Sequence, residues 1–148
     1  PPRGPLAELR RPQAPANRLP NWGWRGATGV ALSANDLHRW WVALGSGSVL
    51  APASVERMLA PQVEINAGLS GAYGWFQEKT PAGERALWTR GTDESGENAI
   101  LLVLPDRELA IIGLAHSEAT DDERDPITRR LAWEAVALLT ATAPAPAR

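Results

Sequence analysis

The chain has 148 residues, of which 44% are hydrophobic and 22% are charged, and its formal net charge is −2. This composition is typical of one globular domain, the charge gives no electrostatic basis for binding nucleic acid, and no apolar run reaches the ~18 residues that a membrane span needs. The lack of cysteine excludes disulfides, thiolate nucleophiles and Cys-ligated zinc, and two histidines, His38 and His116, are too few for a multi-histidine metal site.

The two ends of the chain differ in composition from its middle. Residues 1–21 hold six prolines and almost no apolar periodicity, which predicts an extended or disordered segment. Residues 22–142 are expected to form one folded region, and the APAPAR sequence of residues 143–148 is expected to be a disordered tail.

Two helices are predicted in the first half of the folded region. Ser33 and Asp36 fit a capping box, in which the serine oxygen and the carboxylate accept hydrogen bonds from free backbone N–H groups of the first turn. Gly45 is a natural end for this helix. Apolar residues recur on one face between these limits: Leu37, Trp40, Trp41 and Leu44. A shorter helix is predicted from about Pro52 to Ala60, because proline is favoured at the first helical position.

The second half reads as a run of strands. Residues 68–74 are rich in glycine and predict a loop, which is followed by strands at Trp75–Lys79 and Arg85–Thr89. Two apolar runs, Glu97–Leu104 and Glu108–Ala115, flank a Pro-Asp-Arg turn and predict a hairpin. The runs are continuous rather than alternating, which indicates that both faces of the sheet are covered.

A terminal helix is expected to begin at Asp125-Pro126 and to run to about Thr142. Apolar residues recur along one of its sides: Ile127, Leu131, Ala135 and Leu138.

Several of these segments, in this order, resemble the C-terminal part of serine β-lactamases and penicillin-binding-protein-like hydrolases, on the class C and esterase-like branch. The segment Arg25–Trp40 resembles the stretch that leads into a capped helix reading D-L-x-R, and Val49–Gln62 resembles the helix that follows it. Tyr73–Phe76 (YGWF) resembles the entry to the sheet, and Leu102–Leu114 resembles its closing hairpin. The resemblance covers roughly residues 22–139.

The resemblance implies an α+β fold, specifically part of an α/β/α sandwich with an antiparallel sheet and a packed C-terminal helix. It implies acyl transfer or hydrolysis of a small-molecule amide or ester in the full-length protein, with no cofactor and no metal. The partner that it implies is a missing N-terminal half of the same domain. It suggests a periplasmic or secreted location.

The family acts through three motifs, and two of them are absent from this chain. None of the seven serines has a lysine three residues later, and the single lysine is Lys79, so the Ser-x-x-Lys nucleophile motif is missing. Tyr73 is followed by Gly-Trp, so the Tyr-x-Asn motif is missing as well. We therefore expect no catalytic residue in this chain and no activity from it alone.

The third motif, Lys-Thr-Gly or His-x-Gly on a strand, has an altered counterpart. Thr89, Arg90 and Gly91 occupy its place and are the predicted substrate-binding residues, with the cation moved one position so that it points to the other face of the strand. A possible cleft rim is formed by three further residues: Trp88, Ser95 and Gly96. The plain alternative is a strand that ends at the triplet and runs into a solvated loop.

Other residues admit functional and ordinary interpretations. His38 fits a solvated helix position, and His116 fits a loop residue better than a general base. The acidic residues of the loop at 92–98 do not have the spacing of an EF-hand. Trp22 and Trp24 suggest an alternative function, a non-enzymatic module that binds a carbohydrate or protein partner.

Overall fold

The computed structural model describes residues 32–92, 97–116 and 126–142. All helices and strands that it describes lie in one unit of the chain, Ser33–Arg148. Several predictions fall outside the described residues: the segments 1–21 and 143–148, Trp22, Trp24, Ser95 and Gly96.

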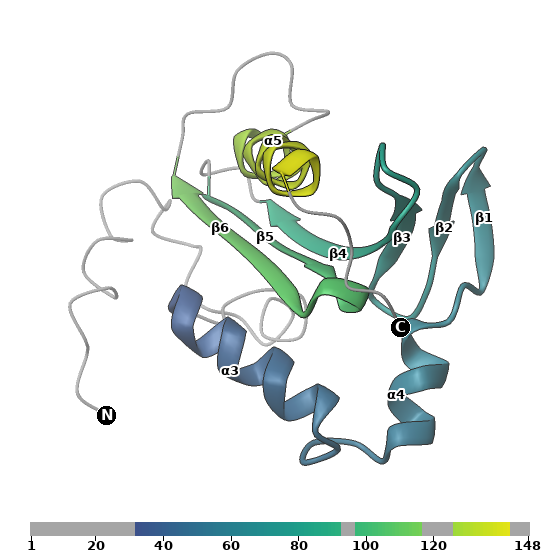
Figure 1. Cartoon of the computed structure of the whole chain (residues 1–148). Coiled ribbons are helices and arrows are strands. Elements are labelled where there is room, and N and C mark those ends of the chain that lie inside the picture. Colours follow the sequence, from purple (N-terminus) through teal and green to yellow (C-terminus); the bar gives the residue numbers. More distant parts are fainter. Residues whose placement is uncertain (1–31, 93–96, 117–125, 143–148) are drawn as a thin grey trace, which may run out of the picture. The chain divides into compact units, whose positions relative to one another are not determined.

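The described part of this unit contains three α-helices and a six-stranded antiparallel sheet (Figure 1). The helices are α3 (Ala34–Gly45), α4 (Pro52–Leu59) and α5 (Ile127–Thr142). The strands are β1 (Val63–Asn66), β2 (Leu69–Gly71), β3 (Phe76–Lys79), β4 (Arg85–Thr92), β5 (Glu97–Leu104) and β6 (Leu109–His116). The sheet order is β1-β2-β3-β4-β5-β6, so each strand lies beside its neighbours in the chain. None of the described helices is long and apolar enough to cross a membrane.

The predicted helix starts are confirmed by their local hydrogen bonds. Ser33 Oγ accepts from the Asp36 backbone N–H at 3.2 Å, and the Asp36 carboxylate accepts from the Ser33 N–H at 3.1 Å. This is the reciprocal pattern of a capping box. Helix α4 has Pro52 in its first turn, as the sequence indicates.

The predicted hairpin is also confirmed. Strands β5 and β6 pair in continuous register from Glu97↔His116 to Leu104↔Leu109. The turn between them is a single 3₁₀ turn, η1 (Pro105–Arg107), and Glu108 closes it in the left-handed conformation with φ of 52°. The chain must reverse direction sharply here, because only four residues separate Leu104 from its pairing partner Leu109.

Helices cover both faces of the sheet, which confirms the α/β/α arrangement and the α+β fold class (Figure 1). On one face, Ala132 and Val136 of α5 pack against a buried cluster that includes Trp88 and Leu102. On the other face, Trp41 of α3 and Met58 of α4 pack against a second cluster: Trp75, Leu87, Leu101 and Val103. Both clusters share β4 and β5, which explains why the apolar run of β5 is continuous.

The apolar side of α5 that the sequence displays is not the side that meets the sheet. Thr128, Ala132 and Val136 are buried against the sheet, whereas Leu131 is 56% exposed and Leu138 is 71% exposed. Helix α5 therefore has one stripe of small and β-branched residues that fits closely onto the sheet, and a second, larger apolar stripe beside it.

Two details of the sheet and one of helix α3 also differ from the sequence prediction. Strands β1 and β2 were not predicted, and β2 lies inside the glycine-rich stretch expected to be a loop. Strand β4 continues to Thr92, three residues beyond its predicted end. Trp40, which lies on the apolar face of the predicted helix, is 39% exposed and stacks on the buried Trp75 with ring centroids 6.2 Å apart.

Candidate active-site wall

The triplet Thr89-Arg90-Gly91 lies inside a paired strand. Its three residues pair with Leu101, Ile100 and Ala99 of β5, and the pairing continues to Thr92↔Asn98. The strand therefore extends one residue beyond the triplet, to Thr92, and the backbone hydrogen-bonded ladder fixes all three positions.

The register divides the triplet between the two faces of the sheet. Thr89 pairs with Leu101, which belongs to the cluster on the α3/α4 face, while Arg90 pairs with Ile100, which belongs to the cluster under α5. Since side chains alternate along a strand, Thr89 and Gly91 share the α3/α4 face and the Arg90 side chain lies on the other. One face of β4 consequently carries the Thr89 hydroxyl, and the other carries the Arg90 guanidinium.

Trp88 is held on the α5 face and is only 4% exposed. Its Nε1 donates to Glu78 Oε1 at 2.8 Å, and its ring stacks on Phe76 with centroids 4.4 Å apart. The Arg129 guanidinium of α5 lies 5.0 Å from the same ring and 3.5 Å from Glu78 Oε1. Trp88 thus fixes α5 to the sheet and does not share a face with Thr89.

Among the described residues, the side chains of the α3/α4 face are well covered up to the row that contains Thr89. In that row Leu101 is buried and Ile112 packs against the same cluster. The next row along the strands is Gly91, Ala99 and Leu114, in which Gly91 is exposed and Leu114 is 46% exposed. We call this second row the open row.

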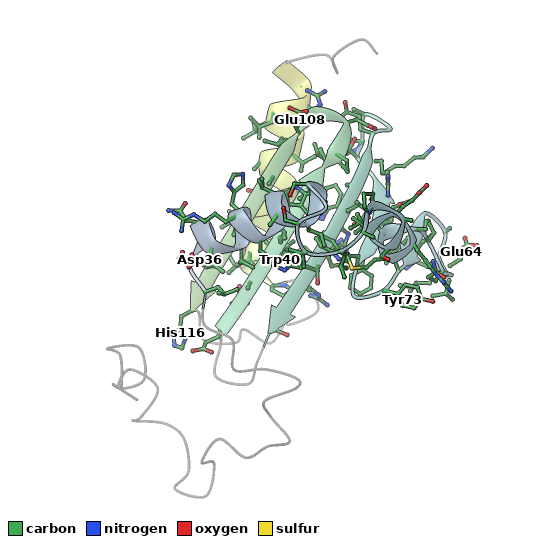
Figure 2. All side chains as sticks on the ribbon, turned by 90° about the horizontal axis from the view of Figure 1, so that it is seen from below. Asp36, Trp40, Glu64, Tyr73, Glu108 and His116 are labelled. Atoms are coloured by element: carbon green, nitrogen blue, oxygen red, sulfur yellow. The ribbon has the colours of Figure 1, made fainter. Side chains whose placement is uncertain are left out.

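At the β4 end of the open row, Gly91 has no close neighbour above it among the described residues. A Cβ built on Gly91 would meet no atom within 4 Å among the described residues outside its chain neighbours. Figure 2, which looks onto this face, shows α3 crossing the sheet and His116 beyond it at the end of β6. The open row is therefore made of small or apolar residues, and Thr89 is the nearest hydroxyl of β4 on the same face.

The two histidines lie at the surface. His38 is exposed on α3, as the sequence indicates, and His116 is exposed at the end of β6, where it pairs in register with Glu97. His116 is a strand residue and not the loop residue that was predicted. The described residues contain no cluster of three His, Cys, Asp or Glu side chains that is suited to a metal.

Three of the serines make hydrogen bonds that stabilise local structure. Ser33 caps α3, and Ser46 donates to the Ala43 carbonyl at 2.9 Å while sharing a hydrogen bond of 2.7 Å with Ser48. Lys79 is exposed at the end of β3, opposite Arg85. The chain's only lysine thus lies at the end of a strand. No serine precedes it by three residues, so it is not part of a Ser-x-x-Lys motif.

Three comparisons relate the chain to known proteins. A family model described as Beta-lactamase matches residues 2–134. A solved structure, titled the crystal structure of penicillin binding protein from Bacillus halodurans, superposes with a TM-score of 0.59 at 17% identity. The match covers 73% of this chain and 30% of that protein. No curated protein matches the chain.

Proposed function

The chain belongs to the Beta-lactamase family, and from this premise we propose that it forms the C-terminal wall of the active site of a serine hydrolase. The complete enzyme opens an amide or ester of a small molecule by acyl transfer. This chain spans 30% of the penicillin-binding protein that it resembles in fold, so the proposal assigns the remaining catalytic groups to polypeptide outside these residues.

The observation that carries the proposal is the open row beside Thr89. Gly91 and Ala99 have no large side chain, and among the described residues Gly91 is exposed while Ala99 is partly buried. A strand with small residues lets a ligand approach its backbone closely. This part of β4 therefore suits a substrate that lies along the strand and hydrogen-bonds to it.

The reaction needs groups that this sequence lacks. A serine hydroxyl attacks the carbonyl carbon, its proton passes to a base, and the leaving group departs with a proton to give an acyl-serine that water then hydrolyses. The chain has no Ser-x-x-Lys and no Tyr-x-Asn motif. The nucleophile and its base must come from elsewhere, and β4 contributes binding and orientation.

Thr89 replaces the lysine or histidine of the family motif, which bears on the substrate class. A threonine hydroxyl can donate a hydrogen bond to a substrate oxygen but supplies no positive charge. Arg90 lies on the other face of β4. An esterase-like preference for uncharged substrates follows from this exchange.

Activity measurements test whether catalysis requires groups outside the 148 residues. We expect the purified 148-residue chain to hydrolyse neither p-nitrophenyl acetate nor a chromogenic β-lactam. The longest protein encoded by the reading frame that contains this sequence is expected to carry Ser-x-x-Lys and to hydrolyse the ester. Serine-dependent turnover by the 148-residue chain alone refutes the proposal.

Substitution at the wall tests the role of β4 in that longer protein. Thr89→Val is expected to reduce kcat/KM for the ester about tenfold or more, since a hydroxyl that contacts the reacting substrate is lost. Thr92→Val, the same change on the opposite face of β4, is the matched control and should alter kcat/KM less than about twofold. Equal effects of the two substitutions would contradict the assignment of the site to the Thr89 face.

A further inference from the structure

A stack of three tryptophans lies beside the candidate active-site wall, and the proposed function leaves it unexplained. Trp40 of α3 stacks on Trp75, with ring centroids 6.2 Å apart and ring planes 8° from parallel. Trp41, the next residue of α3, contacts Trp75 with centroids 5.5 Å apart and an interplanar angle of 53°. We call these three residues the indole stack.

The register of β3 and β4 places the indole stack next to Thr89. Phe76 pairs with Trp88 in an antiparallel ladder. One residue further along, the same register sets Trp75 level with Thr89. Both side chains lie on the α3/α4 face, because Trp75 belongs to the cluster on that face and side chains alternate along β4. Trp75 is therefore the neighbour of Thr89 on the side of β4 away from β5.

The three indoles differ in their exposure to solvent. Trp75 is 4% exposed, Trp41 is partly buried and Trp40 is 39% exposed. Figure 2 shows Trp40 on the side of α3 that faces the His116 end of the sheet. The open row lies toward that same end, two residues from His116 along β6. Trp40 therefore exposes its indole on the same side of α3 as the open row.

An exposed indole next to a hydroxyl suits an uncharged aromatic ring as its ligand. Aromatic rings stack on indoles in offset or edge-to-face arrangements, and their burial removes apolar area from water. The contact with Trp75 restricts the Trp40 side chain before binding, which lowers the entropy lost when a ring packs on it. Asp36 and Arg39, the charged residues of α3 nearest to Trp40 in sequence, pair with each other at 3.4 Å. This ion pair leaves no single charge to favour an ionic ligand.

We propose that Trp40, held in place by Trp75, forms a subsite for an aromatic ring of the substrate, so that the enzyme selects esters or amides that carry such a ring near the reacting carbonyl. The inference rests on the proposed function, which places the substrate along β4 beside Thr89. Trp40 contacts the ring and determines specificity, whereas the buried Trp75 positions Trp40.

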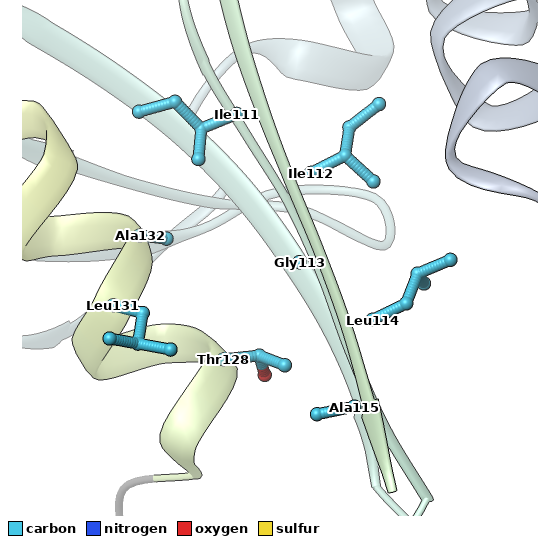
Figure 3. A pocket seen from close by; sticks show the side chains of 8 residues that line it. All are labelled: Ile111, Ile112, Gly113, Leu114, Ala115, Thr128, Leu131 and Ala132. Carbon is cyan, nitrogen blue, oxygen red and sulfur yellow. The ribbon is translucent and has the colours of Figure 1, made fainter.

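The opposite face of the sheet offers an apolar surface that serves as a control. An open hollow of about 240 Å³ lies between α5 and β6 (Figure 3). The described residues that line it include no aromatic ring, and one of them, Leu131, is 56% exposed. A ligand that binds any apolar surface is expected to depend on Leu131 as much as on Trp40.

Hydrolysis of three esters by the longest protein encoded by the reading frame tests the preference. Methyl phenylacetate carries a ring in its acyl part, phenyl acetate carries one in its leaving group, and methyl acetate has none. We expect Trp40→Ala to lower kcat/KM for at least one aromatic ester about tenfold more than for methyl acetate. Trp40→Phe should retain most of the preference, and Leu131→Ala should change the ratio less than about twofold.

The ratio of the rates on one preparation does not depend on how much of the variant is folded. A selective loss for methyl phenylacetate assigns the ring to the acyl part, and a selective loss for phenyl acetate assigns it to the leaving group. An equal loss for all three esters, or an equal effect of Leu131→Ala, overturns the proposal.

Binding without turnover separates this inference from the proposed function. N-benzylacetamide, an uncharged amide with a ring, is titrated into the same protein while NMR follows the indole N–H resonances, with Trp40 assigned by Trp40→Phe. We expect the Trp40 resonance to shift in wild type and in Leu131→Ala, and to shift much less with N-methylacetamide. A shift at Trp40 in a protein that hydrolyses no ester removes the hydrolase proposal and leaves the ring subsite. Hydrolysis without a shift at Trp40 does the reverse.

Discussion

Two glycines of the sheet have opposite relations to their surroundings. A Cβ on Gly113 would lie 3.1 Å from Ile100 Cγ2 and 3.2 Å from Thr128 Cβ, whereas a Cβ on Gly91 would meet nothing within 4 Å among the described residues. Gly113 is therefore glycine because α5 packs closely against β6. The fold of the described residues does not account for Gly91, which suits a position reserved for a ligand.

Substituting each glycine by alanine distinguishes a glycine required for packing, Gly113, from one that packing does not require, Gly91. We expect Gly113→Ala to lower the free energy of unfolding by about 1–3 kcal/mol, because α5 must move to accommodate the methyl group. Gly91→Ala should leave it unchanged or raise it by up to about 1 kcal/mol, since alanine is favoured over glycine in a strand. Urea denaturation of both variants measures the difference, and a large loss at Gly91 would contradict the open row.

The carboxyl group of Asp36 gives the start of α3 a pH dependence. Hydrogen bonds from the Ser33 hydroxyl and backbone, with a smaller contribution from Arg39, hold the pKa of Asp36 below its ordinary value of 3.8. A lowered pKa in the folded state means that the stabilisation is complete above pH 3.8 and is lost as the pH falls through the folded-state value.

The matching variant is Asp36→Asn, which cannot ionise. We expect the difference in unfolding midpoint between wild type and Asp36→Asn to be constant above about pH 5 and to shrink as the pH is lowered through the carboxylate range. Urea titrations across that range measure it. A difference that does not change with pH would mean that the capping carboxylate has the same pKa in both states.

Residues whose structure depends on local contacts were predicted well from the sequence. The Ser33–Asp36 capping box involves groups three positions apart. The exposure of Trp40 depends on where Trp75, far along the chain, places its ring. Helical spacing identifies the face on which Trp40 lies but not the extent to which a distant element covers it.

At the scale of elements, an ion pair connects two turns of the sheet. Arg107 of η1 donates from Nε to both carboxylate oxygens of Glu84 at 2.9 and 3.0 Å, and its Nη2 lies 2.9 Å from Oε1. The side chains are 11% and 13% exposed. This geometry ties the turn before β4 to the turn before β6.

Removing one partner should cost more than removing both. Arg107→Met leaves the Glu84 carboxylate poorly solvated and is expected to lower the free energy of unfolding by about 2–3 kcal/mol. The double variant with Glu84→Gln should recover part of that loss. A double-mutant cycle by chemical denaturation measures the coupling, and additive effects would contradict a direct interaction.

The elements that the sequence predicted are those with a strong periodic or turn signal. The hairpin of β5 and β6 has long apolar runs around a proline turn. Strands β1 and β2 are four and three residues long, too short for alternation to stand out, although Val63 and Ile65 do alternate with polar residues. Strand β4 continues to Thr92 because it pairs with β5 up to that residue. The sequence of β4 alone contains no pattern that predicts this pairing.

At the scale of the whole molecule, the two clusters of the core are coupled through shared strands. Leu87 and Leu102 are both fully buried on β4 and β5, but they face opposite layers of helices. Disrupting either layer therefore weakens the strands on which the other depends.

Truncation in either layer is expected to destabilise the whole unit. Leu87→Ala and Leu102→Ala should each lower the free energy of unfolding by about 2–5 kcal/mol. Tryptophan fluorescence and far-UV circular dichroism should report one coincident transition in both variants. Two separated transitions would show that the layers unfold independently.

The site is less predictable from the sequence than the fold. The place of Thr89, Arg90 and Gly91 at the end of a predicted strand, together with the order of the flanking elements, predicted the candidate wall, and the register shows that Arg90 faces away from Thr89. The open row could not be predicted, because Ala99 and Leu114 come from β5 and β6 and meet Gly91 only through strand pairing.

The order of the sheet follows the order of the chain, and this has a consequence for how the protein folds. Every strand pair closes between consecutive segments, with only the residues between Lys79 and Arg85, for example, separating β3 from β4. Short loops cost little closure entropy, and a low contact order favours rapid folding. The strands of the meander can therefore pair hairpin by hairpin as the chain leaves the ribosome, and α5, synthesised after them, then packs on one face of the sheet.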